Sequence, residues 1–156
     1  MTEVKVIKDL SDTNNLDDII LLIQKQMKVI DGNTEYGRIK KALYNALQTS
    51  NKAVLFLCLS DGNMKQGFAF GNICSGLETG ADYFWINELY IDPLFRNKNI
   101  ASELLVFIEK WAKKNQIKYV ACSTGCRNIP AQKLYKKNGF SVNKTMWVDK
   151  TIISPK

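Results

Sequence analysis

Apolar residues recur along this chain at two spacings, one typical of helices and one typical of strands. Between Leu16 and Ile30 they stand three and four positions apart and stop at Asp31-Gly32, which predicts an amphipathic helix. The segment 53–59 is continuously apolar and predicts a buried strand. By the same reasoning, the predicted helices cover 16–30, 36–47, 100–114 and 128–138, and the predicted strands cover 4–7, 53–59, 66–73, 83–91, 117–122 and 140–147.

The order of these elements predicts the fold class. It reads β-α-α-β-β-β-α-β-α-β, which is typical of an α/β fold with a mixed central sheet and helices on both faces. The unit from Tyr83 to Cys122 has the strand–helix–strand order of a βαβ crossover. A loop is expected at Cys74–Asp82, where two glycines interrupt the apolar pattern. With 156 residues and no linker segment, the chain is expected to form one domain over 1–156.

Charge is divided unevenly along the chain. The net charge is +7, but residues 1–92 hold nine Lys and Arg against twelve Asp and Glu, whereas residues 93–156 hold thirteen against three. The basic C-terminal part suits an anionic partner, although lysines that only solvate helix faces would give the same count. Histidine is absent, so a Ser-His-Asp or Cys-His arrangement and any imidazole acid or base are excluded.

The remaining composition predicts a plain intracellular protein. The cysteines at 58, 74, 122 and 126 form no CxxC pair, so no metal site is expected. The first residues lack a basic segment followed by an apolar one, and the longest apolar run, 53–59, is too short to span a bilayer. We therefore expect a cytoplasmic protein with no membrane partner.

The stretch from Glu88 to Ala101 is the first that suggests chemistry. A strand ends at Pro93, and a short loop with Arg96 and Lys98 leads into the next helix. The first N–H groups of a helix lack internal partners and favour an anion. Asn99 is expected where the loop needs a left-handed residue, a conformation that Asn tolerates well. Taken alone, the stretch fits a phosphate site or an ordinary connection with surface cations.

The stretch from Asn128 to Phe140 is the second. Asn128 is a good helix N-cap and Gly139 ends the helix. Tyr135 lies on the apolar face of this helix, where it could also be an ordinary core aromatic.

Together the two stretches resemble the GNAT superfamily of acyl-CoA-dependent N-acyltransferases. The family's helix pattern, Asn-x-x-Ala-x-x-Leu-Tyr-x-x-x-Gly-Phe, is matched at every named position from Asn128 to Phe140. The family's cofactor loop, Arg/Gln-x-x-Gly-x-Gly/Ala, is matched at Arg96 and Ala101, with Asn99 in place of the central glycine. That replacement keeps the backbone conformation but weakens a close phosphate contact.

The resemblance implies acetyl-CoA as cosubstrate and assigns roles to residues around it. The pantetheine pairs with the strand main chain before the loop, the pyrophosphate lies on the loop amides beside Arg96, and Asn128 bonds the pantetheine arm. Tyr135 protonates the departing thiolate, a role that suits a phenol with a pKa of about 10. The implied cofactor-binding residues are Leu89, Tyr90, Ile91, Arg96, Asn97, Lys98, Asn99, Ile100, Ala101, Ser102, Asn128 and Tyr135.

The acceptor amine must lose protons, and without histidine this needs a carboxylate or a relayed water. Glu88, on the strand beside the thioester, is the candidate base. Some similar enzymes carry the acidic residue one position earlier, where this chain has Asn87, and adjacent strand residues point to opposite faces. Glu88 as a surface carboxylate without a role stays the alternative. A ternary complex without a covalent enzyme intermediate is expected, since no base activates a cysteine.

The leading hypothesis is an N-acetyltransferase that acts on a primary amine of a small molecule, of aminoglycoside, polyamine or amino-acid type. The acidic residues of 1–92 could line the amine pocket. The alternatives are a protein N-acetyltransferase and a non-catalytic acyl-CoA-binding regulatory module. A nucleic-acid partner is disfavoured because the cations flank a cofactor loop, and a homodimer is left open.

Overall fold

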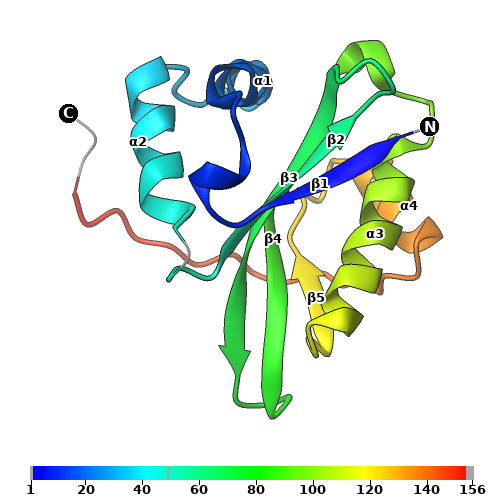
Figure 1. Cartoon of the computed structure of the whole chain (residues 1–156). Helices are drawn as coiled ribbons and strands as arrows, with labels where there is room; N and C mark the ends of the chain where they lie inside the picture. The colour runs from blue at the N-terminus through cyan, green and yellow to red at the C-terminus, as the bar shows by residue number, and fades with distance from the viewer. Residues whose placement is uncertain (1, 49, 154–156) are drawn as a thin grey trace. The chain divides into compact units, whose positions relative to one another are not determined.

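A five-stranded sheet, in the order β1-β2-β3-β4-β5, forms the frame of the molecule (Figure 1). The first four strands pair antiparallel and β5 pairs parallel with β4, so the sheet is mixed and the predicted α/β class is confirmed. The computed structural model describes residues 2–48 and 50–153, and the chain divides into two compact units, 1–123 and 124–156. The first unit holds β1 (Glu3–Ile7), the 3-10 turn η1 (Leu10–Asp12), α1 (Leu16–Val29), α2 (Tyr36–Ala46), β2 (Ala53–Leu59), β3 (Lys65–Gly76), β4 (Ala81–Ile91), the 3-10 turn η2 (Pro93–Phe95), α3 (Ile100–Lys114) and β5 (Tyr119–Cys122), and the second holds α4 (Ile129–Lys137).

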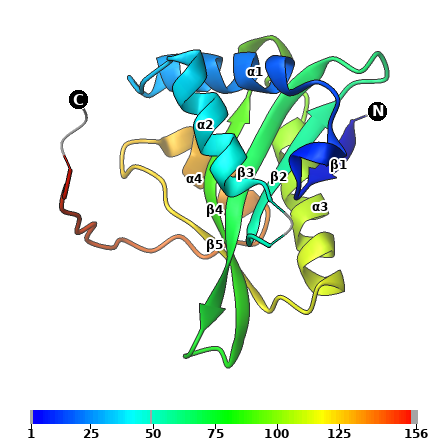
Figure 2. The ribbon, with the colours of Figure 1, turned by 60° about the vertical axis from the view of Figure 1, so that its left-hand side comes forward.

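Different helices cover the two faces of the sheet, as Figures 1 and 2 show for α1 and α2 on one side and α3 on the other. Leu55 and Leu57 of β2 pack with residues of α1 and α2 in one apolar core. Phe56, between them, packs edge-on against Phe84 of β4 and Trp111 of α3, at centroid distances of 5.6 and 5.0 Å. Because β2 is buried on both faces, its sequence is continuously apolar. Each buried side chain of this size stabilises the fold by about 1.5–3 kcal/mol.

The expected loop at Cys74–Asp82 is wrong, because most of it is strand. Cys74 pairs with Tyr83, and pairing continues to Gly76 opposite Ala81, so β3 and β4 form one long hairpin. Only the turn between these strands is irregular, and it is closed by Gly80 with φ of +60°. The two glycines mark a tight turn and a close approach of the strands, and they do not mark a long loop. Figure 1 shows the hairpin as an arm that extends beyond the other strands.

The strand expected at 140–147 is also wrong. The structure assigns neither helix nor strand to this segment. Phe140, Val142 and Met146 would share one face of a strand, but Lys144 interrupts this face, and Met146 and Trp147 are 91% and 73% exposed. A strand whose apolar side chains stay exposed gains little from packing against a sheet.

The helices and the free cysteines bear on membrane insertion and on thiol reactivity. Among the residues that the structure describes, no helix combines the length and the apolar character needed to cross a membrane. Of the free cysteines, Cys58 is buried, Cys74 and Cys122 are half-buried and Cys126 is exposed. Burial raises the pKa of the Cys58 thiol to about 12, so this thiol stays protonated and behaves as a small apolar side chain.

Candidate functional site

A β-bulge in β4 sets the direction in which Glu88 points. Gly71 of β3 lies opposite Ile86, and the preceding residue of β3, Phe70, lies opposite Glu88. Asn87 is therefore an extra residue in β4, and its side chain is exposed. Because side chains alternate across a strand, one extra residue moves all following side chains to the other face.

The residues on either side of the bulge show this exchange of faces. Phe84, before the bulge, contacts Trp111 of α3 at a centroid distance of 5.2 Å. Tyr90, after the bulge and six positions further on, belongs to the core that includes residues of α1 and α2. In a regular strand both residues would face α3, and so would Glu88. The bulge thus keeps the Glu88 carboxylate out of the aromatic core and turns it toward α1.

Glu88 is half-buried there and has a polar partner on α1. The Gln26 amide donates a hydrogen bond through Nε2 to Glu88 Oε2. Burial raises the pKa of the Glu88 carboxyl above its ordinary value of 4.5, and the Gln26 hydrogen bond, which favours the charged form, offsets part of this shift. A carboxylate with a raised pKa is a stronger proton acceptor than an exposed one. The arrangement therefore suits a general base.

Beyond the bulge, one edge of β4 has no strand partner in the part of the chain that the structure describes. β5 pairs with β4 only from Tyr83 to Ile86, whereas β3 accompanies β4 as far as Ile91. The Asp92 N–H donates to the Gln66 carbonyl of β3 at 2.9 Å, and main-chain groups alternate between the two edges of a strand. The main-chain groups of Tyr90 therefore point toward β3, and those of Leu89 and Ile91 point to the open edge. An extended ligand can pair with such an edge as a further strand would.

Arg96 occupies part of this edge. Its Nε donates to the Ile91 carbonyl at 3.0 Å, and its guanidinium lies 5.8 Å from the centre of the Tyr90 ring. Both contacts tie the loop after β4 to the last residues of the strand. The guanidinium has further donors that can bind a phosphate in addition.

The loop into α3 has the backbone that the sequence predicts. Asn99 has φ of +64° and Asn97 has φ of +61°, so the left-handed conformation expected at Asn99 is confirmed and a second one accompanies it. The first helical hydrogen bond of α3 runs from Glu103 N to Asn99 O at 3.0 Å. The N–H groups of Ile100 and Ala101 precede it, at the positive end of the helix dipole. This geometry can bind an anion.

An ion pair connects this loop to α1. Lys25 Nζ lies 2.6 Å from Asp92 Oδ2, and the Asp92 side chain is 5% exposed. Asp92 also accepts the Leu94 N–H at 3.0 Å, as the N-cap of η2. Burial opposes the charge on Asp92, but the hydrogen bonds from Lys25 and Leu94 outweigh it and hold the pKa of Asp92 below 3.8. Asp92 therefore keeps its charge and fixes the start of the loop.

The second unit presents the other predicted residues on α4. Asn128 is the N-cap, since its Oδ1 accepts the Ala131 N–H at 3.2 Å, and Gly139 has φ of +83° after the last turn. Tyr135 packs on Phe140 with ring centroids 5.4 Å apart. The helix start and end predicted from the sequence are confirmed. The structure thus brings Glu88, the open edge of β4 and the loop before α3 together in the first unit, and it holds Asn128 and Tyr135 on one helix of the second.

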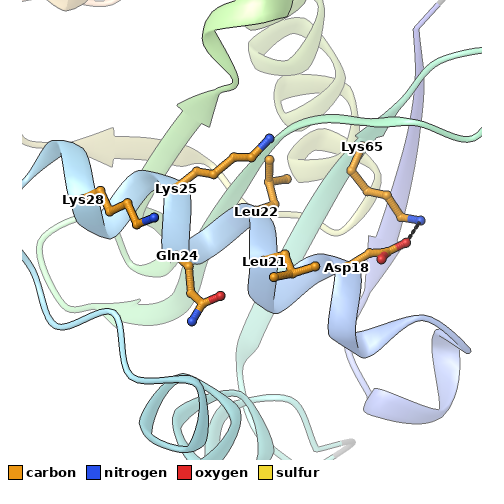
Figure 3. A pocket seen from close by; sticks show the side chains of 7 residues that line it. All are labelled: Asp18, Leu21, Leu22, Gln24, Lys25, Lys28 and Lys65. Carbon is orange, nitrogen blue, oxygen red and sulfur yellow. Dashed lines mark hydrogen bonds and ion pairs between the residues drawn. The ribbon is translucent and has the colours of Figure 1, made fainter.

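A pocket of about 390 Å³ lies beside α1 (Figure 3). Three lysines, Lys25, Lys28 and Lys65, line it together with one acidic residue, Asp18. Figure 3 shows the Lys65 ammonium paired with Asp18, at 2.7 Å. This pocket is basic and is not the acidic amine pocket that the charge of residues 1–92 suggests. Among the described residues, no group of three or more His, Cys, Asp or Glu side chains could hold a metal ion.

The sequence interpretation missed three residues of this region: Gln26, Lys25 and Asp92. Gln26 had a visible signal, because it stands three positions after Ile23 on the apolar stripe of α1. A polar residue at an inward position needs a buried partner. Lys25 and Asp92 gave no signal, since 67 positions separate the two in the chain and only the tertiary fold makes them neighbours.

A family model described as "Acetyltransferase (GNAT) family" matches residues 20–140. A streptothricin acetyltransferase of Escherichia coli is 33% identical over 64 residues, which are 41% of this chain and 37% of that protein. An aminoglycoside N(6')-acetyltransferase type 1 of Salmonella typhimurium is 25% identical over 88 residues, which are 54% of this chain and 60% of that protein. The matches therefore span less than two thirds of these relatives.

Two solved structures are similar over almost the whole chain. A crystal structure of a probable acetyltransferase is 21% identical, with a TM-score of 0.83 and coverage of 99% of both chains. An aminoglycoside acetyltransferase from an uncultured soil metagenomic sample is 13% identical, with a TM-score of 0.78 and coverage of 98% of this chain and 97% of the other. At these identities the likeness establishes the fold.

Proposed function

Because the chain belongs to the acetyltransferase (GNAT) family, we propose that it transfers the acetyl group of acetyl-CoA to a primary amine of a small molecule. The observation that carries the proposal is the position of Glu88 directly after the bulge, half-buried, at the start of the unpaired edge of β4. A proton acceptor and a binding edge for an extended cosubstrate are thereby adjacent on one strand. The matched helix motif from Asn128 to Phe140 supports the same proposal.

For the acceptor we propose an amine of aminoglycoside type, with polyamines and amino acids as further members of the panel to be tested. The names of two relatives, a streptothricin acetyltransferase and an aminoglycoside N(6')-acetyltransferase, favour this class. A half-buried carboxylate also suits a cationic amine, because opposite charges attract most strongly where water is partly excluded.

We propose that acetyl-CoA binds along β4 and the start of α3. Its pantetheine pairs with the main chain of Leu89 and Ile91, beside the Tyr90 ring. Its pyrophosphate lies on the amides of Asn97 to Ser102, next to Arg96. Lys98 adds positive charge, and Asn128 bonds the pantetheine arm. The support comes from the open edge of β4 and from the start of α3, where the first N–H groups have no acceptor within the helix.

The reaction follows from these positions as direct attack in a ternary complex. Glu88 takes a proton from the ammonium, and the amine nitrogen then attacks the thioester carbonyl. The C–N bond forms, the C–S bond breaks, and the thiolate receives the Tyr135 hydroxyl proton. The nitrogen, which is cationic after the attack, releases its second proton to water, and the Tyr135 phenolate takes a proton back from water. No covalent enzyme intermediate is needed. We propose that one acetyltransferase domain over 1–156 does this in the cytoplasm, where the free cysteines stay reduced.

The test is a panel of amines incubated with acetyl-CoA and the protein, with acetylated product measured by mass spectrometry. We expect Tyr135→Phe to lower kcat about 100-fold, because the thiolate loses its proton donor, while the affinity for acetyl-CoA is kept. Tyr119→Phe, at an exposed tyrosine of β5, is the matched control and should retain wild-type turnover. Tight acetyl-CoA binding with no turnover on any amine would instead identify a regulatory acyl-CoA-binding module.

A further inference from the structure

Gln26 is buried and only one end of its amide has a partner. The residue is 5% exposed, and its side-chain Nε2 donates to Glu88. Its Oε1 is fully buried and has no hydrogen-bond partner among the described residues. Buried polar atoms in proteins almost always have a partner, so an orphaned acceptor at this place needs an explanation.

The chemistry of the pair dictates this orientation. An ionised carboxylate only accepts hydrogen bonds, so Gln26 must turn its NH₂ group to Glu88 and its oxygen away. Both ends of an amide share one carbon atom. The unpaired Oε1 therefore lies only one amide width from the contact with the carboxylate. α1 and β4 thus place two acceptors close together: the Glu88 carboxylate, which is charged, and the enclosed Gln26 Oε1, which is neutral.

We propose that Gln26 is a positioning residue of the amine site: its Nε2 hydrogen bond orients the Glu88 carboxylate, and its enclosed Oε1 is the acceptor for the O–H that Glu88 gains with the amine proton. This inference rests on the proposed function. Because Oε1 is enclosed by protein, the substrate does not reach it, and the neighbouring Glu88 carboxyl is the group that can offer it a donor. The Nε2 hydrogen bond also favours the ionised form of Glu88 before the proton is transferred.

The amide serves both states of Glu88. When Glu88 takes the amine proton, an N–H bond breaks and an O–H bond forms, so the carboxyl becomes a donor. Rotation of the Gln26 amide then brings Oε1 to that new O–H group. A side chain with one donor end and one acceptor end can follow this change, and an apolar side chain cannot.

The charged surroundings of Glu88 leave this hydrogen bond as the main polar influence. Burial is the largest cause of its raised pKa, and Gln26 is the group that lowers it. Lys25, the next cation on α1, is turned to Asp92. Across β3, the residue opposite Glu88 is the apolar Phe70. Removal of the Gln26 amide should therefore raise the pKa of Glu88 further.

The experiment compares Gln26→Met with Gln24→Met, a matched change on the same helix whose glutamine donates to the Thr34 carbonyl instead. For Gln26→Met we expect kcat to fall about tenfold with KM for acetyl-CoA unchanged, because the Glu88 carboxylate loses the hydrogen bond that orients it. We also expect the acidic limb of the kcat–pH profile to move to higher pH, since a base with a raised pKa loses its proton only at higher pH. Gln24→Met should leave both unchanged.

A second measurement does not depend on turnover. The Glu88 carboxyl is titrated by ¹³C NMR in the wild type and in both variants, and its pKa should rise in Gln26→Met only. Equal kcat values and equal Glu88 titration in the two variants would overturn the inference. If no amine is acetylated by the wild type, the proposed function fails, and the NMR titration then decides the positioning role alone: an unchanged Glu88 pKa in Gln26→Met would overturn that too.

Discussion

The two halves of β4 differ in the number of their paired edges and in the kind of side chain that they bury. From Tyr83 to Ile86 the strand is paired on both edges, to β3 and to β5, and Phe84 is completely buried. From Glu88 to Ile91 it is paired, among the described residues, on one edge only, and it carries a half-buried carboxylate. The boundary between the halves is one extra residue.

This difference shows how one strand supports the fold and the candidate site together. The doubly paired half anchors the strand against α3, so the second half can leave its outer edge open without loss of register. An open edge in an isolated strand would be unstable or prone to pair with another chain. Here the loop side chain of Arg96 and the ion pair of Asp92 hold its far end. Mutations in the two halves should therefore have different kinds of effect.

The largest effect is expected in the doubly paired half. Phe84→Ala should lower the free energy of unfolding by about 4 kcal/mol, because it leaves a cavity between Phe56 and Trp111. The loss is measured by urea denaturation. KM values of the folded protein should change less than about twofold, since the site lies beyond the bulge. Phe84→Leu serves as control and should lose less than half as much. A large change in KM with little loss of stability would contradict the view that the doubly paired half supports the fold and the open half carries the site.

Glu88→Gln in the open half should impair catalysis and leave stability almost unchanged. We expect kcat to fall about 100-fold, because the amine loses its proton acceptor, with little change in the melting temperature. Asn87→Ala is the matched neighbour, exposed at the bulge, and should keep kcat within about twofold. Steady-state kinetics with acetyl-CoA and the best amine measure both. A lower kcat in Asn87→Ala with wild-type kcat in Glu88→Gln would transfer the functional role to the other face of the strand.

The smallest effect concerns the loop that follows the open half. Asn97 has φ of +61° and is exposed, so Asn97→Ala should lower the free energy of unfolding by about 1 kcal/mol through backbone strain alone. Asn97→Gly should be neutral within a few tenths, since glycine adopts this conformation freely. Chemical denaturation of the two variants side by side separates them. Equal losses would mean that the side chain of Asn97 matters and its conformation does not.

Much of the fold was predictable from the sequence because it depends on local periodicity. The apolar stripe of α1 and the continuous run of β2 are each determined by burial within a few residues, and the bounds of β2 agree with the prediction. The hairpin at Cys74–Asp82 and the unformed strand at 140–147 were not predictable in the same way. In the first case cross-strand pairing outweighs the low strand propensity of the glycines. In the second, the alternation of polar and apolar residues is present, but the structure does not bury its apolar side chains.

The candidate site was predictable to a smaller extent. The left-handed Asn99 and the N-cap Asn128 follow from local conformational preferences, and the structure confirms both conformations. The direction of Glu88 could not be predicted, because it depends on a bulge that the strand pattern conceals. The contact with Gln26 depends on how α1 packs on the sheet, which no local spacing encodes. The roles of these residues in catalysis stay predictions.

The extra residue in β4, Asn87, also changes which positions of the strand share a face. Because the bulge absorbs Asn87 and the pairing resumes after it, every later residue of β4 faces the layer opposite to the one that a regular strand of this sequence would give it. Glu88 and Phe84 are therefore separated by an even number of positions and still face opposite layers of the molecule. A regular strand that kept Asn87 as a paired residue would carry the Glu88 carboxylate into the layer of Phe56 and Trp111, whereas deletion of Asn87 would leave Glu88 opposite Phe70. Whether a residue of β4 faces α1 or α3 therefore depends on whether it lies before or after Asn87, as well as on its place in the alternation.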